Sequence, residues 1–266
     1  MTKPELYHAR NSVCSQKVRL CLAEIGLPWE GRLLDLMAGD QYAPEYLALN
    51  PEAVVPTLVD DGRVVVESSL ICEYLDRTYN GGTLMPDDPA HRIGVSHWLL
   101  RSIQLHAAIN ALTFSTANRG AKFKGLDAAA RDRKLARMPN PLARLRLVSL
   151  TDEGLASPFV AQALVDLRRA FGDMSRALAR HDWLSGPDFG LGDIGVIPYV
   201  DRLERLGFGG LWAQDFPGID GWIDRMRARP AFAQAIDAVA PEGSFERMRS
   251  GAAPFREEVL RLWAVP

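Results

Sequence analysis

Two side chains that can stabilise or form a thiolate, Ser12 and Cys14, lie near the N-terminus of this 266-residue chain. They stand between a strand-like run, residues 5–8, and a helical stripe of apolar residues, namely Val18, Cys21, Leu22 and Ile25. The amides and positive dipole end of a starting helix favour an anion and lower a thiol pKa from about 8.5 toward neutrality. The Ser12 hydroxyl can donate a hydrogen bond to such a thiolate, or it can only cap the helix.

Two further short patterns can recognise parts of a peptide-like ligand. Val55-Pro56 opens a strand-like run, which is typical either of a trans proline at a strand start or of a cis turn that exposes the Val55 backbone to an extended peptide. Glu67-Ser68 precedes a helical run, where the serine can bind a carboxylate and the glutamate an ammonium. The same dipeptide is also an ordinary helix start.

The hydrophobic periodicity predicts the elements that must position these patterns. Up to residue 83, strand-like and helical runs alternate as β-α-β-α-β-β-α, with a hairpin signalled by Asp61-Gly62. After the turn-rich residues 85–89, every well-formed run is helical. We therefore expect an α/β domain over residues 1–83 and an all-α domain over residues 89–266. In the second domain the pattern predicts helices at about 89–119, 127–152, 158–180, 191–206, 217–228 and 254–264.

Composition excludes several classes of function. The 31 Lys and Arg nearly balance the 33 Asp and Glu, so a net charge of −2 does not attract the whole protein to nucleic acid or an anionic membrane. No apolar run approaches the roughly 18–20 residues of a membrane span, and no secretory signal is evident, so we expect a cytoplasmic protein. The 3 cysteines and 5 histidines show neither a CxxC pair nor zinc spacing, which argues against disulfides and a metal site.

The order and spacing of the three patterns resemble the glutathione transferase superfamily. The likeness is to serine-type bacterial and fungal members near the lignin β-etherases, the FuA-like proteins and the ganglioside-induced differentiation proteins. The matching segments are Ser12–Leu20, Asn50-Pro51, Val55-Pro56, Glu67-Ser68, Trp183–Gly186 and Gly190–Ile194. The last of these is similar to the family's capping-box helix and contains its Asp as Asp193, but Gly190 stands where a Ser or Thr cap is usual.

This resemblance implies a thioredoxin-like domain that binds glutathione as co-substrate, and a helical domain that completes the acceptor cleft. Ser12 would hydrogen-bond the glutathione thiolate, and the Val55 backbone, next to Pro56, would pair with the cysteinyl unit. Glu67 and Ser68 would hold the γ-glutamyl end. Many members carry a cation just before the Val-Pro pair, where this chain has Ala53-Val54. Gln41, or a cation from elsewhere, would then bind the glycyl carboxylate.

The implied reaction is attack of the glutathione thiolate on an electrophilic aromatic acceptor, with β-aryl ether cleavage as one candidate. Two alternatives stay open. Cys14 also matches the cysteine of the bacterial cysteine-type class, which would make the protein a thiol transferase or reductase that forms mixed disulfides with glutathione. The chain could instead be a non-catalytic binding protein, because a fold does not settle function. Residues expected to border the acceptor are Asn11, Cys14, His106, Phe114, Asn118 and Arg119.

Two segments have less specific patterns. Residues 119–146 hold nine Lys or Arg and two Asp or Glu, a local net charge of +7, which fits a solvated helix face or an anion-binding surface. The tail from Pro241 has an apolar face that would cap the cleft or cover core, formed by Phe255, Val259, Leu260 and Trp263. The resemblance further implies a homodimer that acts on a small-molecule electrophile.

Overall fold

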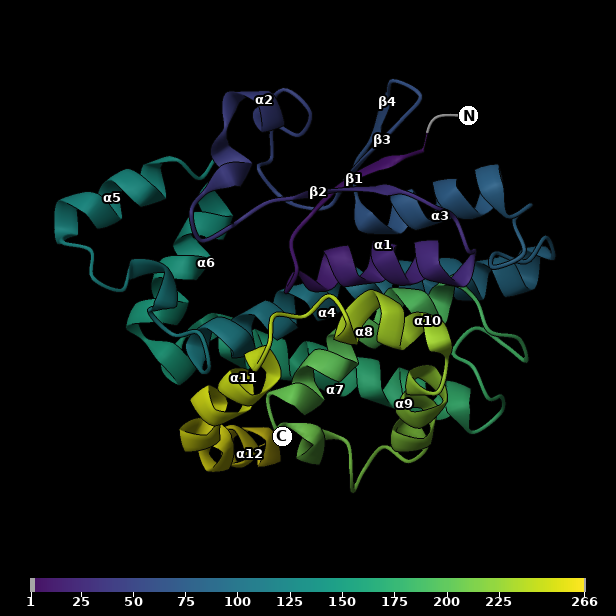
Figure 1. Ribbon diagram of the computed structural model, residues 1–266. Helices are drawn as coiled ribbons and strands as arrows, with labels where there is room; N and C mark the ends of the chain where they lie inside the picture. Colours follow the sequence, from purple (N-terminus) through teal and green to yellow (C-terminus); the bar gives the residue numbers. More distant parts are fainter. Residues whose placement is uncertain (1–2, 266) are drawn as a thin grey trace.

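The N-terminal part of the computed structural model, which describes residues 3–265, is a four-stranded mixed sheet with helices on both faces (Figure 1). The strands are β1 (Glu5–His8), β2 (Glu30–Leu33), β3 (Thr57–Asp60) and β4 (Arg63–Val65), in the order β2-β1-β3-β4. β1 runs parallel to β2 and antiparallel to β3, which pairs with β4. Two helices, α1 (Val13–Glu24) and α3 (Ser68–Tyr79), lie between the sheet and the rest of the molecule, and α2 (Pro44–Leu47) lies on the other side (Figure 1).

The remaining chain is helical. Its α-helices are α4 (Pro89–Ser115), α5 (Ala128–Ala136), α6 (Pro141–Asp152), α7 (Pro158–Leu178), α8 (Leu191–Arg205), α9 (Ile219–Arg227), α10 (Pro230–Phe232), α11 (Ser244–Ala252) and α12 (Arg256–Ala264). Short 3-10 or π turns are η1 (Asp40–Tyr42), η2 (Ala121–Phe123), η3 (Gly154–Ala156), η4 (Gly209–Leu211), η5 (Ala233–Asp237) and η6 (Ala253–Phe255). The predicted fold class, a thioredoxin-like domain followed by a helical domain, is confirmed. The exact bounds predicted for the two domains stay predictions, and their outer ends, residues 1 and 266, lie outside the described residues.

Helix α8 is the centre of the helical part. Its residues from Leu191 to Leu203 are all buried, because α4, α9 and α11 pack against it and α1 covers another side. The apolar stripe of α1 supplies that contact, with Val18, Leu20 and Leu22 fully buried. The start of α1, where the sequence places its candidate thiolate residues, is therefore fixed against both the sheet and the helical part.

Three arginines join α1 to the helical part along the whole length of the helix. Arg202 donates to the Asn11 carbonyl at 2.7 Å, just before α1 begins. Arg19, in the middle of α1 and 2% exposed, donates to the Ala235 carbonyl at 2.8 Å. Arg229 makes two hydrogen bonds of 2.7 Å to the carboxylate of Glu24, the last residue of α1. Each end and the middle of α1 thus has its own polar link to the helical part.

Some predicted elements are divided or shortened in the structure. The helix expected at 127–152 is two helices, because Pro139 and Pro141 interrupt its backbone hydrogen bonds and Asn140 starts α6 by accepting from the Ala143 amide at 3.0 Å. Strand β2 ends at Leu33, since Asp35 begins a turn in which its carboxylate accepts the Met37 amide at 2.8 Å. Helix α11 was not predicted.

The C-terminal tail covers core. Trp263 of α12 packs edge-on against Phe171 of α7, with ring centroids 6.1 Å apart, and against Phe216 at 6.3 Å. Val259 is completely buried. Of the two roles considered for the tail, these contacts favour the cover of the helical core. Among residues 3–265, no helix is both long enough and apolar enough to cross a bilayer.

Candidate functional site

Ser12 both caps α1 and keeps a hydrogen available for a ligand. Its Oγ accepts the Ser15 amide at 3.2 Å, which satisfies one of the unpaired amides at the start of the helix. Within residues 3–265 the Ser12 hydroxyl donates to no other group, and the residue is partly exposed. The two roles that the sequence left open are therefore compatible, since capping uses the oxygen as acceptor and a thiolate would use the O–H.

The backbone at Val55 is available for pairing with an extended ligand. The Val55-Pro56 peptide bond is cis, and the preceding carbonyl, that of Val54, is held by the Tyr46 hydroxyl and by the Asn50 amide at 3.0 Å. No hydrogen bond among the described residues uses the N–H or C=O of Val55 itself. A main-chain donor and acceptor therefore stand free at the start of β3, the arrangement that strand addition requires.

Glu67 and Ser68 open α3 in a conformation that helix capping alone does not explain. Glu67 has a φ of +68°, a left-handed conformation that costs a non-glycine residue roughly 1–3 kcal/mol and that clusters at ligand sites. Its side chain is exposed and caps no amide of the helix. Ser68 is buried, yet its hydroxyl has no hydrogen-bond partner within residues 3–265. Both side chains are thus free to bind the two charges of an amino-acid head group.

A cluster of four polar side chains, which we call the thiol cluster, lies where α1 meets the helical part. It consists of Cys14 and Lys17 of α1, His106 of α4 and Tyr199 of α8. The Cys14 sulfur lies 3.5 Å from the Tyr199 hydroxyl, and the Lys17 ammonium lies 5.2 Å from the centre of the Tyr199 ring. The His106 ring is tilted by 57° against that same ring, with the two ring centres 6.1 Å apart. Cys14 is partly exposed as a residue, whereas Tyr199 is 1% exposed.

The thiol cluster makes Cys14 acidic. Burial alone would raise the pKa of the Cys14 thiol, but the charge and hydrogen bond of His106, together with the charge of Lys17, lower this pKa to about 6. The Cys14 thiolate in turn raises the pKa of His106 against the effect of burial. Lys17 is 1% exposed, donates to Ser69 at 3.1 Å and Ser102 at 2.9 Å, and has its pKa lowered mainly by burial. This lowered pKa favours the thiolate form of Cys14.

The structure brings some predicted cleft residues to this region and directs others elsewhere. His106 belongs to the thiol cluster, and Phe114, eight residues further along α4, is partly buried with the Lys122 ammonium 5.1 Å from its ring centre. Asn11 is exposed next to Ser12, and Asn118 is partly buried after α4 ends. Arg119 instead donates to the carbonyls of Thr151 at 3.0 Å and Asp152 at 2.9 Å, so its guanidinium closes the end of α6.

Two members of the thiol cluster were missed by the sequence reasoning. Lys17 could have been noticed, because it lies among the buried residues of α1, where a charged side chain is costly unless it has polar partners. Tyr199 gave none, since its position opposite Cys14 depends on how α8 docks against α1. Among residues 3–265, no group of three or more His, Cys, Asp or Glu is arranged to hold a metal ion.

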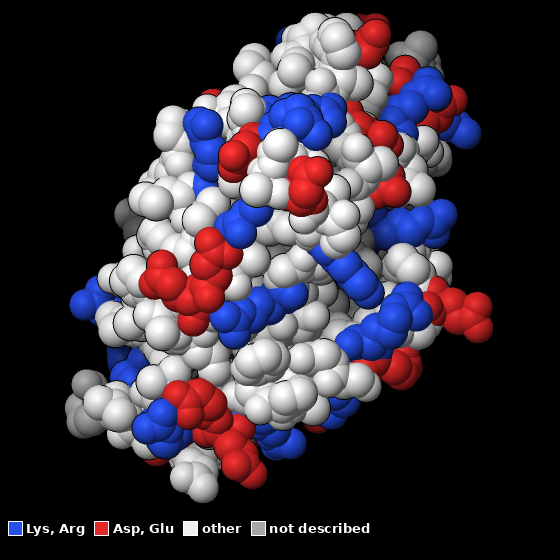
Figure 2. Space-filling model, turned by 90° about the vertical axis from the view of Figure 1, so that its left-hand side faces the viewer, with Lys and Arg blue, Asp and Glu red and all other residues white. Residues whose placement is uncertain are grey.

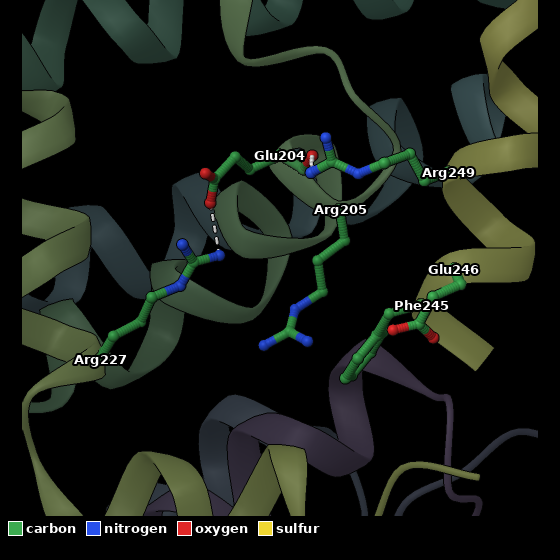
Figure 3. Close-up of a pocket in the computed structure, with 6 residues that line it drawn as sticks. All are labelled: Glu204, Arg205, Arg227, Phe245, Glu246 and Arg249. Atoms are coloured by element: carbon green, nitrogen blue, oxygen red, sulfur yellow. Dashed lines mark hydrogen bonds and ion pairs between the residues drawn. The ribbon is translucent and has the colours of Figure 1, made fainter. Parts of the chain in front are cut away.

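A separate cavity lies away from these groups and is lined by paired charges (Figure 3). It has a volume of about 370 Å³ and lies between α8, α9 and α11. Arg205 forms ion pairs with Asp201 and with Asp237 at 2.7 Å, and Arg227 pairs with Asp201 and Glu204. Arg205 and Arg227 therefore already have carboxylate partners, and Arg249 donates to the Glu204 carbonyl at 3.3 Å.

Comparison with known proteins gives matches in both parts of the chain. The family described as glutathione S-transferase, N-terminal domain matches residues 6–83, and glutathione S-transferase, C-terminal domain matches residues 128–225. The glutathione S-transferase hmp2 of Hypomyces subiculosus is 30% identical over 85% of this chain and 94% of its own length. Protein LigF of Sphingobium sp. strain SYK-6 is 25% identical over 94% of this chain and 99% of its own.

Solved structures show the same fold. The crystal structure of the β-etherase LigF from Sphingobium sp. strain SYK-6 superposes with a TM-score of 0.80 at 24% identity, covering 89% of this chain and 100% of that one. A theta-class glutathione S-transferase from Xanthomonas axonopodis pv. citri, with glutathione bound, gives a TM-score of 0.65 at 25% identity and covers 89% of this chain and 98% of that one.

Proposed function

Because this chain belongs to the glutathione S-transferase family, we propose that it binds glutathione and activates the thiolate at Ser12 for attack on an electrophilic aromatic acceptor. The observation that carries this proposal is the unused O–H of Ser12 at the start of α1. A hydrogen bond from this hydroxyl, together with the amide dipoles of the helix, favours the thiolate over the thiol.

The other free groups fit the rest of glutathione. The main-chain N–H and C=O of Val55, beside Pro56, pair with the cysteinyl unit. Glu67 binds the γ-glutamyl ammonium, and Ser68 binds its carboxylate. The glutathione thiol then loses its proton, its sulfur forms a bond to the electrophilic carbon, and the bond from that carbon to the leaving group breaks. The leaving group takes the electron pair and departs as an anion.

The acceptor that we propose first is a β-aryl ether. Support comes from the 25% identity to LigF over nearly the full length of both chains. In this reaction the leaving group is a phenolate, and a protonated His106, which is only partly buried in the thiol cluster, would stabilise its developing charge.

We further propose that the protein acts as a homodimer in the cytoplasm. Apolar side chains gather on the outer faces of α3 and α4, where Leu70, Ile93, Leu100 and Ile103 are 57%, 71%, 68% and 61% exposed. Ile93, Leu100 and Ile103 are seven and three residues apart, so they share one face of α4. Clustered exposed apolar side chains of this kind mark a protein interface.

Cys14 supports a second candidate function. With a pKa of about 6, its sulfur is a thiolate at neutral pH and can attack a glutathione mixed disulfide. That attack would form a Cys14–glutathione disulfide and release the other thiol. A second glutathione thiolate would then attack this disulfide, which restores Cys14 and produces oxidised glutathione. The protein would then be a thiol transferase, and Ser12 would have only its capping role.

One experiment separates these functions. Wild type, Ser12→Ala and Cys14→Ala are titrated with glutathione while thiolate absorbance is followed, and each is assayed with an aryl ether and with a mixed disulfide. We expect Ser12→Ala to lose the glutathione thiolate and the ether cleavage, and Cys14→Ala to retain both. If only Cys14→Ala is inactive, the thiol transferase is correct. If wild type binds glutathione and converts neither substrate, the protein is a binding protein.

A further inference from the structure

Two lysines of the helical part face the sheet-containing part without a carboxylate partner. Lys122 of η2 and Lys134 of α5 line a small cavity whose opposite wall is formed by Leu36, Gln41 and Tyr42, on the segment between β2 and α2. Neither lysine forms an ion pair within residues 3–265. The face that carries α5 shows Lys and Arg side chains gathered around a hollow (Figure 2).

The contacts of these lysines leave their charge available. The Lys134 ammonium donates to the Met37 carbonyl at 3.3 Å, which is a neutral acceptor, and the Lys122 ammonium lies over the Phe114 ring. Burial and the nearby charge of Lys134 lower the pKa of Lys122, as expected for two amines that lie close together. The acidic side chains of the facing loop form no ion pair with either lysine within residues 3–265. Asp35 accepts the Met37 amide and Asp40 accepts the Asp35 amide, each at 2.8 Å.

Gln41 adds a hydrogen-bond acceptor to the cavity lined by the two lysines. Its Nε2 reaches the Leu36 carbonyl at 3.4 Å, whereas its Oε1 is buried and receives no hydrogen bond among the described residues. A buried carbonyl oxygen without a donor is costly in a folded protein. An amide N–H followed by a carboxylate, the terminal unit of a peptide, would satisfy Gln41 and the two lysines together.

The expected course of glutathione along the sheet leads to this cavity. Its γ-glutamyl end lies at the start of α3 and its cysteinyl unit at Val55, so its glycyl end continues beyond Val55, within the roughly 10 Å reach of an extended tripeptide. Leu36, which lines the cavity, packs in the same apolar cluster as Val55. The residue before Val55 cannot bind the carboxylate, because Val54 is an apolar side chain that is 53% exposed.

We infer that Lys122 and Lys134, with Gln41 beside them, bind the glycyl carboxylate of glutathione. This inference rests on the glutathione binding proposed above and assigns the third anchor to the helical part instead of to the sheet-containing part. The cavity has room for only about 10 Å³, so the carboxylate lies at its mouth, between the two ammonium groups. Glutathione then bridges the two parts, and its binding holds η2 and α5 against the loop that contains Gln41.

The test compares glutathione with its glycyl ethyl ester, in which an ethyl group replaces the terminal negative charge. Dissociation constants of both are measured by calorimetry for wild type, for Lys122→Met/Lys134→Met, and for the control Lys124→Met, an exposed lysine of the same segment. We expect the double variant to bind glutathione about tenfold more weakly than wild type, as loss of a charge-assisted contact predicts, and to bind the ester unchanged. The control should match wild type with both ligands.

The outcomes separate this inference from the function on which it rests. Equal glutathione affinity in wild type and the double variant overturns the role of the lysines and leaves glutathione binding intact. An equal loss for glutathione and ester also overturns it, because the substitutions would then act on the fold or on another part of the ligand. If wild type binds neither ligand, the proposed function fails together with the inference.

Discussion

Asp193 offers a sharp test of how the helical part is held together. Its carboxylate is completely buried near the start of α8 and accepts three hydrogen bonds, from the Leu184 amide at 3.0 Å, the Gly190 amide at 3.2 Å and the Trp222 indole at 2.8 Å. These donors belong to the loop before α8, to the residue that starts α8, and to α9. The perturbation is Asp193→Ala, with Asp193→Asn as the matched control that keeps the shape.

The magnitude follows from two opposing contributions. Loss of the carboxylate leaves three buried donors unsatisfied, at about 2 kcal/mol each. It also relieves the cost of burying a charge, which raises the pKa of Asp193 from 3.8 to about 6 and corresponds to about 3 kcal/mol at neutral pH. We therefore expect Asp193→Ala to lower the free energy of unfolding by about 3 kcal/mol. In Asp193→Asn the side-chain oxygen retains two donors and no charge is buried, so a loss below about 1 kcal/mol is expected.

The raised pKa also sets a pH dependence. Between pH 3.8 and about 6 the folded protein holds a proton on Asp193 that the unfolded chain has lost, so this residue lowers stability as the pH rises. Relative to Asp193→Asn, wild type should lose about 1–2 kcal/mol between pH 5 and pH 8. Guanidinium denaturation followed by circular dichroism measures each free energy. A difference that does not change with pH, or a loss below about 1 kcal/mol in Asp193→Ala, would refute the reasoning.

Three other predictions concern separate regions. His106→Ala should raise the pKa of Cys14 above about 6, because it removes the largest charge that favours the thiolate. The pH dependence of Cys14 alkylation by iodoacetamide measures this pKa, and an alkylation profile that matches wild type contradicts the role of His106 in the thiol cluster. Leu100→Glu should convert a dimer into a monomer in sedimentation equilibrium, whereas a variant that stays dimeric excludes this face of α4 as the interface. Trp263→Ala should cost about 3–5 kcal/mol in urea denaturation, and a loss below about 1 kcal/mol would mean that α12 does not complete the core around Phe171.

Much of the fold was predictable because local patterns and the final packing agree. The apolar stripe of α1 and the Asp61-Gly62 turn each specify one element, and the structure contains both. Two prolines within five residues around Asn140 were also readable and should have divided the predicted helix. Helix α11 was harder, because its apolar residues are few and its start depends on Gly243 in a left-handed conformation with φ +65°.

The sequence could predict only those parts of the candidate site that are formed by neighbouring residues in the chain. The patterns at Ser12, Val55 and Glu67 each occupy a turn before a helix or strand, so short segments give both their position and their chemistry. The partners of Cys14 are different, because His106 and Tyr199 lie on helices that reach it only after α4 and α8 have packed against α1. The pKa of a thiol depends on such distant charges, which the spacing of residues along one helix does not reveal.

The arginine links along α1 bear on how the molecule unfolds. A division near residue 85 is easy to see in the sequence, but a fragment that ended there would expose the apolar stripe of α1 and would leave Arg19 without the Ala235 carbonyl. The chain from residue 89 onward would likewise lose the surface that covers α8. Neither fragment carries a closed core of its own, so the two parts should melt in a single cooperative transition. A hinge motion between the two parts would have to break three arginine contacts at once. Local motion of the segment between α4 and α6 breaks none of these contacts, so it would open the proposed acceptor site at a lower cost in free energy.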